Sequence, residues 1–549
     1  MASECAVGCV DAVVNSVKRK FNCIKQFWHR YLLVEPVLIL FWAPTLFTFD
    51  KFVTHKACRF SLGYNEAICS AVVYENDYVS DCIPYNVAKK TIITQGPSAE
   101  ELFVDVCSPH FNFAVCKAGD QAQKLINNVY LNTLPIVSVI PYIILMFAGG
   151  WADRYNKRKA FLILPILGRC LYYIVQLTSS IFYESLPFQL SWYFAIIPSV
   201  LGGVPCFLMS AFSYITITTP ESDRVLRIGI LSVFALLTNF LSGIIGHLIN
   251  SEFSKYFGIC VGLEIAAILY IILFIKEPKS NESVSELNDS AGDIQLTNLG
   301  ENVTNIESSP EPPRRNVFKE FFDPMLAIEL IILPFKRRPN NDRLLLLLLI
   351  LCYFLTAGPV ESETKYMDFQ LLNRLEWNEN LQHYYRLMKF GMSINLTFFG
   401  IIAFTKIWKF SDSIVGISDS LIGILFAVFV VVSRVLFYFA GETSTVYYAG
   451  VFDLSLILRL IPIKSLASIL NEGDGKLFSF FGILEAVAVL PFHPIYDAFV
   501  DATGNSYFTL VFLFSEAFYV PNVLIFIACY FLMRRRNSNL AQQDSTEYL

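Results

Sequence analysis

The sequence predicts an all-α polytopic membrane protein with twelve transmembrane helices in two halves of six. Three observations lead to this fold class. The 549 residues are 54% hydrophobic and 16% charged, with a mean hydropathy of +0.50, which is more apolar surface than a soluble fold could bury. Twelve apolar runs are long enough to cross a bilayer, and a polar stretch separates the sixth from the seventh. Basic residues gather in alternate connections between these runs.

The twelve runs, numbered here as spans 1 to 12, divide the chain into five segments. Spans 1 to 6 lie near 32–54, 125–148, 160–183, 190–216, 226–250 and 257–275. Spans 7 to 12 lie near 343–366, 384–407, 414–438, 446–470, 477–500 and 507–533. The expected segments are an N-terminal tail, an N-terminal half, a linker, a C-terminal half and a C-terminal tail, at 1–31, 32–275, 276–342, 343–533 and 534–549.

The linker is first acidic and rich in Ser and Asn, then rich in Pro and basic. Because such a composition cannot bury a core, we expect it to be largely disordered, with a short amphipathic piece at 317–335.

Alternate connections carry the Lys and Arg residues, and this sets the predicted orientation. The basic clusters are Lys18–Arg30, Arg154–Lys159, Arg224 with Arg227, Arg314 and Arg315 with Lys336–Arg338, Lys406 with Lys409, Lys464 with Lys476, and Arg534–Arg536. Since basic loops stay in the cytosol during insertion, both termini are expected there. No cleavable signal peptide is evident, because a full-length apolar run follows the basic tail. The plasma membrane is the expected location, and an endolysosomal membrane is the alternative.

Five of the thirteen cysteines fall in one long connection, residues 55–124, which this orientation places outside the cell. They are Cys58, Cys69, Cys82, Cys107 and Cys116. Four of them could form two disulfides, with three possible pairings and one thiol left over. The alternative is that they are buried or free thiols.

The turn Gly149–Lys159, GGWADRYNKRK, joins spans 2 and 3 and is too short for anything but antiparallel helices. Gly149 and Gly150 allow a neighbouring helix to pack closely, and Asp153 lies where an acid favours a helix N-terminus. We expect Gly149, Asp153, Arg154 and Arg158 to act as a conformational latch.

This turn, at this place in a twelve-span chain, resembles the signature G-x-x-x-D-R-x-G-R-R of the major facilitator superfamily. Asn156 replaces the second glycine, and Asn tolerates the left-handed backbone that such a turn needs. The resemblance implies the major facilitator fold and secondary active transport by alternating access.

Further short motifs are similar to those of the proton-coupled folate transporter family, solute carrier family 46. They are Val34–Val37, Leu62–Asn65, Arg224 with Arg227, and Gly475 with Leu477–Ser479. This resemblance implies an organic anion as substrate, either folate-like or like a cell-wall fragment or nucleotide, and protons as the co-substrate. One departure is that the acidic residue of the folate-transporting branch is absent early in span 5, where the chain reads Ile230–Val233.

Charged residues inside the spans are the candidate substrate ligands. At mid-membrane an ionisable group costs roughly 2.5–3.5 kcal/mol on insertion scales, so each predicts a partner or a wet cavity. We expect Arg459, Lys389 and Glu361 to bind an anionic substrate. The alternatives are an interhelical ion pair for Arg459, a snorkelling role for Lys389, and a pair along the helix between Glu361 and Lys365.

Proton coupling is expected from a second set of membrane residues, Glu363, Asp453, Glu485 and His247. For Asp453 and Glu485 the alternative is structural pairing, and for His247 it is packing with a hydrogen bond. Other charges are expected to be structural: Arg169 pairs with Glu264, Glu35 anchors or locks a gate, and Asp419 and Arg434 are solvated near the ends of span 9.

The sequence favours a transporter over other classes of protein. It contains no nucleophile elbow, metal-ligand spacing or phosphate-binding loop, so we expect neither an enzyme nor a metal or cofactor site. Its basic residues are scattered between spans, which argues against a nucleic acid polymer as partner; the expected partners are an organic anion, protons and the lipid bilayer. The alternative is a receptor or scaffold that keeps the transporter fold without transport. Oligomeric state is not predicted.

Overall fold

The structure is a computed structural model. The residues that it describes are mostly helical and lie in both predicted halves of the chain. The described residues are 34–42, 49–74, 113–248, 253–277, 317–339, 341–373, 375, 377, 379–402, 417–453, 458–471, 474–503 and 509–547. The tail 1–31, the loop residues Cys82 and Cys107, and the connection 403–416 lie outside them. In the part that is described, every regular element is a helix.

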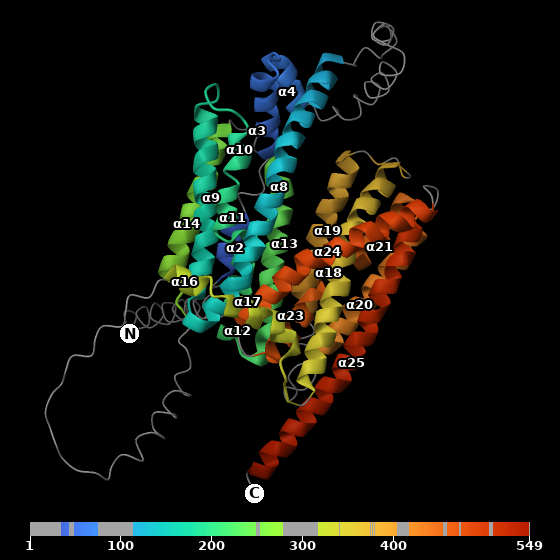
Figure 1. The fold of residues 1–549 in the computed structure, drawn as a ribbon. Helices are drawn as coiled ribbons and strands as arrows, with labels where there is room; N and C mark the ends of the chain where they lie inside the picture. Colours follow the sequence, from blue (N-terminus) through green and yellow to red (C-terminus); the bar gives the residue numbers. More distant parts are fainter. Residues whose placement is uncertain are drawn as a thin grey trace, which may run out of the picture.

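The N-terminal half follows the predicted spans, with two of them divided into shorter helices (Figure 1). Its helices are α2 (Glu35–Trp42), α3 (Phe49–Lys56), α8 (Phe113–Tyr155), α9 (Arg158–Ile181), α10 (Leu190–Tyr193), α11 (Ile196–Val200), α12 (Gly203–Thr218), α13 (Arg224–Leu248) and α14 (Phe253–Phe274). Span 4 breaks at Gly202 and Gly203, whose φ angles are +96° and +54°. Only glycine adopts such angles without strain, so this pair allows α12 to change direction from α11.

The C-terminal half repeats the pattern with one divided span. Its helices are α18 (Asp342–Asn373), α19 (Glu379–Ile402), α20 (Ile417–Tyr438), α21 (Thr443–Asp453), α23 (Leu460–Ile469), α24 (Asp474–Thr503) and α25 (Leu510–Glu547). Each of the twelve predicted runs therefore holds helix. Among the helices described, eight are long and apolar enough to cross a membrane by themselves.

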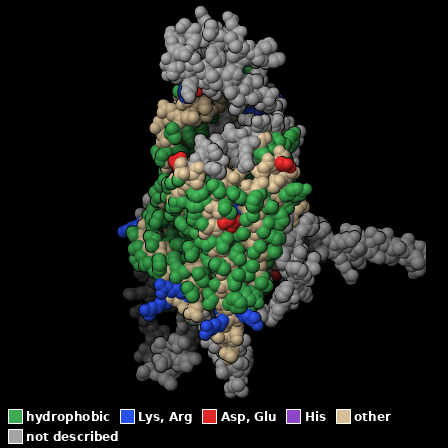
Figure 2. All heavy atoms as spheres, turned by 90° about the vertical axis from the view of Figure 1, so that its right-hand side faces the viewer, with side chains coloured by type: hydrophobic (Ala, Val, Ile, Leu, Met, Phe, Trp, Pro, Cys, Tyr) green, Lys and Arg blue, Asp and Glu red, His purple; other side chains and the backbone are tan. Residues whose placement is uncertain are grey.

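The two ends of the bundle differ in charge. The lower end in Figure 1 carries the turn between α8 and α9 and the starts of α13, α18 and α24; we call it the basic end. Figure 2 shows a broad hydrophobic band over the C-terminal half with Lys and Arg gathered along its lower edge. The two halves meet where α8 packs against α24 and α13 packs against α19.

The linker contributes short helices at the basic end. These are α16 (Val317–Phe321), α17 (Pro324–Ile332) and the 3₁₀ turn η4 (Leu333–Phe335), and they occupy the piece for which the sequence predicts amphipathic structure. Asp323 caps α17 by accepting a hydrogen bond from the backbone N–H of Met325 at 3.0 Å. Both α16 and α17 pack against α8, and α17 also packs against α24.

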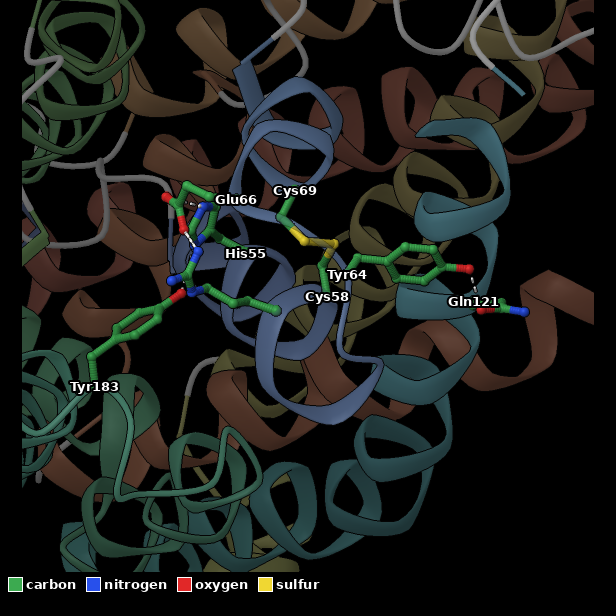
Figure 3. The surroundings of a disulfide bond; sticks show 8 residues. His55, Cys58, Tyr64, Glu66, Cys69, Gln121 and Tyr183 are labelled. Atoms are coloured by element: carbon green, nitrogen blue, oxygen red, sulfur yellow. Dashed lines mark hydrogen bonds and ion pairs between the residues drawn. A yellow bond between two sulfur atoms is a disulfide. The ribbon is translucent and has the colours of Figure 1, made fainter. Parts of the chain in front are cut away.

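The opposite end carries a disulfide-linked extension. There α3 continues into the π-helical turn η2 (Ala57–Ser61), and α4 (Glu66–Tyr74) folds back beside the start of α8. A disulfide joins Cys58 to Cys69, and Figure 3 shows it between the two segments. Cys116 is also disulfide-bonded, with a partner outside the described residues. Three of the five candidate cysteines are therefore disulfide-bonded, and Cys82 and Cys107 lie outside the described residues.

Candidate functional site

A cavity of about 410 Å³ lies between the two halves of the bundle. Six helices contribute to it, α2, α8, α12, α18, α23 and α24, and its walls are largely aromatic and aliphatic. The N-terminal half provides Trp42, Tyr142, Val204, Pro205, Leu208, Met209 and Phe212. The C-terminal half provides Tyr353, Lys464, Phe478, Phe481, Gly482, Glu485, Ala486 and Val489. Its size suits a small organic molecule.

Lys464 brings a positive charge to this cavity. It lies on α23, and its ammonium nitrogen is 4.2 Å from the ring centre of Phe212 and 5.9 Å from that of Tyr353. The two rings belong to opposite halves, so this cation is held by the aromatic faces of both. No carboxylate of a described residue lies within 4.0 Å of it. The sequence placed Lys464 in a cytosolic basic cluster, and this expectation was wrong.

Glu485 supplies the only carboxylate among the lining residues. It lies on α24 and accepts a hydrogen bond from the Tyr353 hydroxyl at 2.7 Å. Because Tyr353 comes from α18, this bond ties two helices of the C-terminal half at the cavity wall. Of the predicted site residues, Glu485 is the one whose side chain the structure places in the cavity.

A separate ionic cluster is buried within the C-terminal half. Arg434 on α20 lies 2.7 Å from Asp453 and 2.8 Å from Glu363, and all three side chains are less than 5% exposed. Asp453 also pairs with Lys389. Tyr519 donates a hydrogen bond to Glu363 at 3.0 Å. The expectation that Arg434 is solvated near the end of span 9 was wrong, because partners on α18 and α21 enclose it.

Arg459 lies beside this cluster and has no ion-pair partner in the part of the chain that the structure describes. Its side chain is fully buried, and none of its three nitrogens has a hydrogen-bond partner among the described residues. Its guanidinium lies 4.6 Å from the ring centre of Tyr519, the residue that also binds Glu363. Lys389, Asp453 and Glu363 therefore lie near one another in this cluster. None of the three lines the cavity. The side chains of Glu361 and His247 lie outside the described part of the structure.

The N-terminal half contains two buried ion pairs. Arg169 lies 3.0 Å from Glu264, as the sequence analysis expected, and its guanidinium is 4.0 Å from the ring centre of Phe41. Glu35 lies 2.8 Å from Arg227, so the start of span 1 is tied to α13. These pairs connect helices of the same half and do not touch the cavity.

Two of the residues predicted to form a latch, Gly149 and Asp153, contact α24 at the basic end of the bundle. Asp153 accepts hydrogen bonds from the backbone N–H groups of Gly475 and Lys476, at 3.0 and 2.9 Å, and pairs with Arg158 at 2.6 Å. A carboxylate at the N-terminus of α24 satisfies N–H groups that have no partner within that helix. One residue of the N-terminal half therefore caps a helix of the C-terminal half.

Close helix packing surrounds this cap. A Cβ atom added at Gly149 would lie 2.2 Å from the Ser479 hydroxyl oxygen and 2.3 Å from the Gly475 carbonyl oxygen. Phe212 stacks on Phe478 at 5.5 Å, between the cavity and the start of α24.

Comparisons with known proteins give one family. The Major Facilitator Superfamily matches residues 130–458, which is more than half of the chain. A search of curated proteins found no match.

Solved structures to which the chain is similar include three transporters. The human organic anion transporter MFSD10 (TETRAN) is 12% identical, with a TM-score of 0.49 over 91% of this chain and 99% of that one. A variant of the E. coli fucose:proton symporter FucP is 16% identical, with a TM-score of 0.48 over 75% and 94%. The proton:xylose symporter XylE is 11% identical, with a TM-score of 0.49 over 90% and 94%.

Proposed function

The chain belongs to the Major Facilitator Superfamily, and from this premise we propose that it is a secondary transporter that moves an organic anion by alternating access. The two halves would rock about the cavity between them and expose it to each side of the membrane in turn. The narrower resemblance to solute carrier family 46 stays a prediction, as do the plasma membrane location and the cytosolic termini.

The observation that carries this proposal is the position of Lys464. A cation in an apolar, aromatic cavity is costly when no described carboxylate forms an ion pair with it, and an anionic ligand would offset that cost. The rings of Trp42, Phe212 and Tyr353 offer flat surfaces on which a conjugated ring of the substrate can stack. An anion that carries an aromatic ring therefore fits this cavity better than a sugar or a cation does.

Glu485 supports a role for protons in the same cavity. When it is ionised, its negative charge opposes the entry of an anion and offsets the charge of Lys464. When it is protonated, Lys464 alone sets the charge of the cavity, and the anion binds more tightly. Binding of a proton and binding of the substrate are then mutually favourable, which is the requirement for symport.

The buried cluster around Arg434 offers a second candidate site. Arg459 retains unused hydrogen-bond donors beside Glu363 and Tyr519, so an anionic group could reach it after a rearrangement of the neighbouring helices. Lys389 and Asp453 would accompany such a rearrangement. Glu361 and His247 stay candidates for substrate and proton binding.

An uptake panel in proteoliposomes tests the proposal. Folates, cell-wall fragments and nucleotides are offered under three conditions: no pH gradient, a vesicle interior more acidic than the medium, and a medium more acidic than the interior. We expect one class of anion to accumulate against its own gradient when protons flow with it. A chain that binds one of these anions but never accumulates it would instead be the receptor or scaffold, the alternative function.

A further inference from the structure

The linker helix α17 carries apolar side chains on more than one face. Leu326, Leu330 and Leu333 are buried at spacings of four and three residues, which makes one face of the helix. The opposite surface of α17 and η4 also consists of large apolar side chains, each 45% to 59% exposed: Met325, Ile328, Ile331, Ile332 and Phe335. An exposed apolar patch of this kind marks a surface that another apolar phase covers.

The buried face ties α17 to both halves of the bundle. Leu326 packs against Gly150 of α8, with contacts of 3.0 Å to an added Cβ. Glu329 lies 3.7 Å from Arg154 of α8 and 2.6 Å from Lys476 of α24. A single carboxylate therefore joins the two helices that meet in the latch.

Two further polar contacts extend this bridge. Asp323 lies 3.0 Å from Arg154, on the N-terminal half. Arg338 donates a hydrogen bond to the Asn471 side chain at 2.8 Å, just after α23 of the C-terminal half. We call residues 324–338 the linker clamp.

The exposed face of the clamp continues the lipid-facing surface of α8. Ile136, Val139 and Ile143 are 45%, 54% and 47% exposed and follow one stripe of that helix toward the basic end. Phe147 lies one turn further on and packs against Phe322 with ring centres 5.3 Å apart. The exposed apolar stripe of α8 thus reaches the linker at Phe322, just before the clamp.

Basic residues flank the apolar face on both sides along the chain. Lys336 and Arg337 follow η4 and are both exposed, and Lys319 is exposed on α16. Apolar residues with cations at their margin are the pattern of a helix that lies in a membrane interface with acidic lipids. Charge complementarity therefore favours a lipid surface over another protein as the occupant.

We propose that the exposed face of the linker clamp inserts into the bilayer leaflet at the basic end, with acidic phospholipid headgroups held by Lys336 and Arg337. The membrane then anchors the clamp across α8 and α24 and favours the state in which the basic end is closed. Opening of that end requires Glu329 to release Arg154 or Lys476. The lipid composition of this leaflet thereby adjusts the conformational equilibrium, whatever the transported substrate is.

Photo-crosslinking of the full chain tests the lipid contact. A photoreactive amino acid is placed at Ile328 or Ile332, and at Leu330 as the control on the buried face, in nanodiscs of phosphatidylcholine with phosphatidylserine. We expect lipid adducts from Ile328 and Ile332 and protein adducts from Leu330. Lys336→Gln with Arg337→Gln should reduce the enrichment of phosphatidylserine in the adducts, by roughly fivefold for each cation removed. Absence of lipid adducts at Ile328 and Ile332, or adducts to another protein in native membranes, would overturn the proposal.

A thiol-labelling assay tests the conformational effect. Ser479→Cys reports on the contact between α8 and α24, and labelling from the basic end is quantified by peptide mass spectrometry. Ile328→Ser with Ile332→Ser should raise labelling, while Ile272→Ser with Leu273→Ser, on the exposed surface of α14, should leave it unchanged. Equal labelling in both double variants would exclude an effect of the linker clamp on the conformational equilibrium, even if lipid adducts are found.

Discussion

Asp153 at the end of α8 accepts hydrogen bonds from the backbone N–H groups of Gly475 and Lys476 at 3.0 and 2.9 Å. The same carboxylate pairs with Arg158 at 2.6 Å, so a single side chain is shared between the turn of the N-terminal half and the first turn of α24. These contacts break only if the two halves separate at this end. The closed basic end is therefore a specific state of the bundle, and it can be disturbed by single substitutions.

Gly149→Ala should open the basic end. The new methyl group would lie 2.3 Å from the Gly475 carbonyl oxygen, and a backbone atom cannot move aside as the end of a side chain can. Gly262→Ala on α14 is the matched control, because an added Cβ there meets no atom within 4 Å. We expect higher thiol accessibility at Ser479→Cys in the first variant only. Unchanged accessibility in Gly149→Ala would mean that α8 and α24 can absorb a methyl group without separating.

Arg434→Met should destabilise the protein far more than Lys389→Met. Removal of Arg434 leaves the buried Glu363 without its cation and Asp453 with Lys389 alone, at a cost of roughly 3–5 kcal/mol. Removal of Lys389 leaves Asp453 paired with Arg434. Thermal unfolding in detergent measures the difference in Tm. Similar losses in the two variants would show that Arg434 is not the centre of the cluster.

Acidification should destabilise the disulfide-linked extension through His55. Burial is the main cause that lowers the pKa of His55 from its ordinary 6.5; the nearby Glu66 carboxylate opposes this shift, and Arg59 adds to it. His55 also lies 3.3 Å from Glu66 and 2.5 Å from the Tyr183 hydroxyl (Figure 3). Lys56 is its neighbour in the chain. Because the unfolded state binds the proton more readily, stability falls as the pH drops from 6.5 toward the folded-state pKa.

Comparison with His55→Gln isolates this effect from other titrating groups. We expect the Tm of the wild type to fall more than that of the variant between about pH 7 and about pH 5.5. A parallel decline in the two proteins would assign the pH dependence to other residues.

The sequence predicted much of the fold because helix formation in a membrane follows from local hydrophobicity. Each apolar run holds helix, and the turn with Asp153 lies against the partner half. The breaks within spans were harder to predict. Span 10 divides into α21 and α23, and the direction of α23 decides that Lys464 lines the cavity. Counting residues along an unbroken helix cannot show this.

Ion pairs between residues on different helices were the other feature that was hard to predict from the sequence. Arg434 was expected near water because of its place along span 9, yet its partners Glu363 and Asp453 lie on two other helices. Distance along one helix does not report what a neighbouring helix presents. The pair Arg169–Glu264 was predicted because an arginine near mid-depth of a span needs a partner.

Uptake by Lys464 variants tests most directly the claim that this chain carries an anion through the cavity. Once the panel has identified a transported anion, Lys464→Met and Lys464→Arg are compared with the wild type in proteoliposomes, at matched protein content. We expect Lys464→Met to raise KM by about tenfold or more, because the variant loses one charge-assisted contact of about 1.4 kcal/mol or more. Lys464→Arg should restore part of the lost affinity. An unaltered KM in correctly folded Lys464→Met would contradict the assignment of this cavity as the site of the anion.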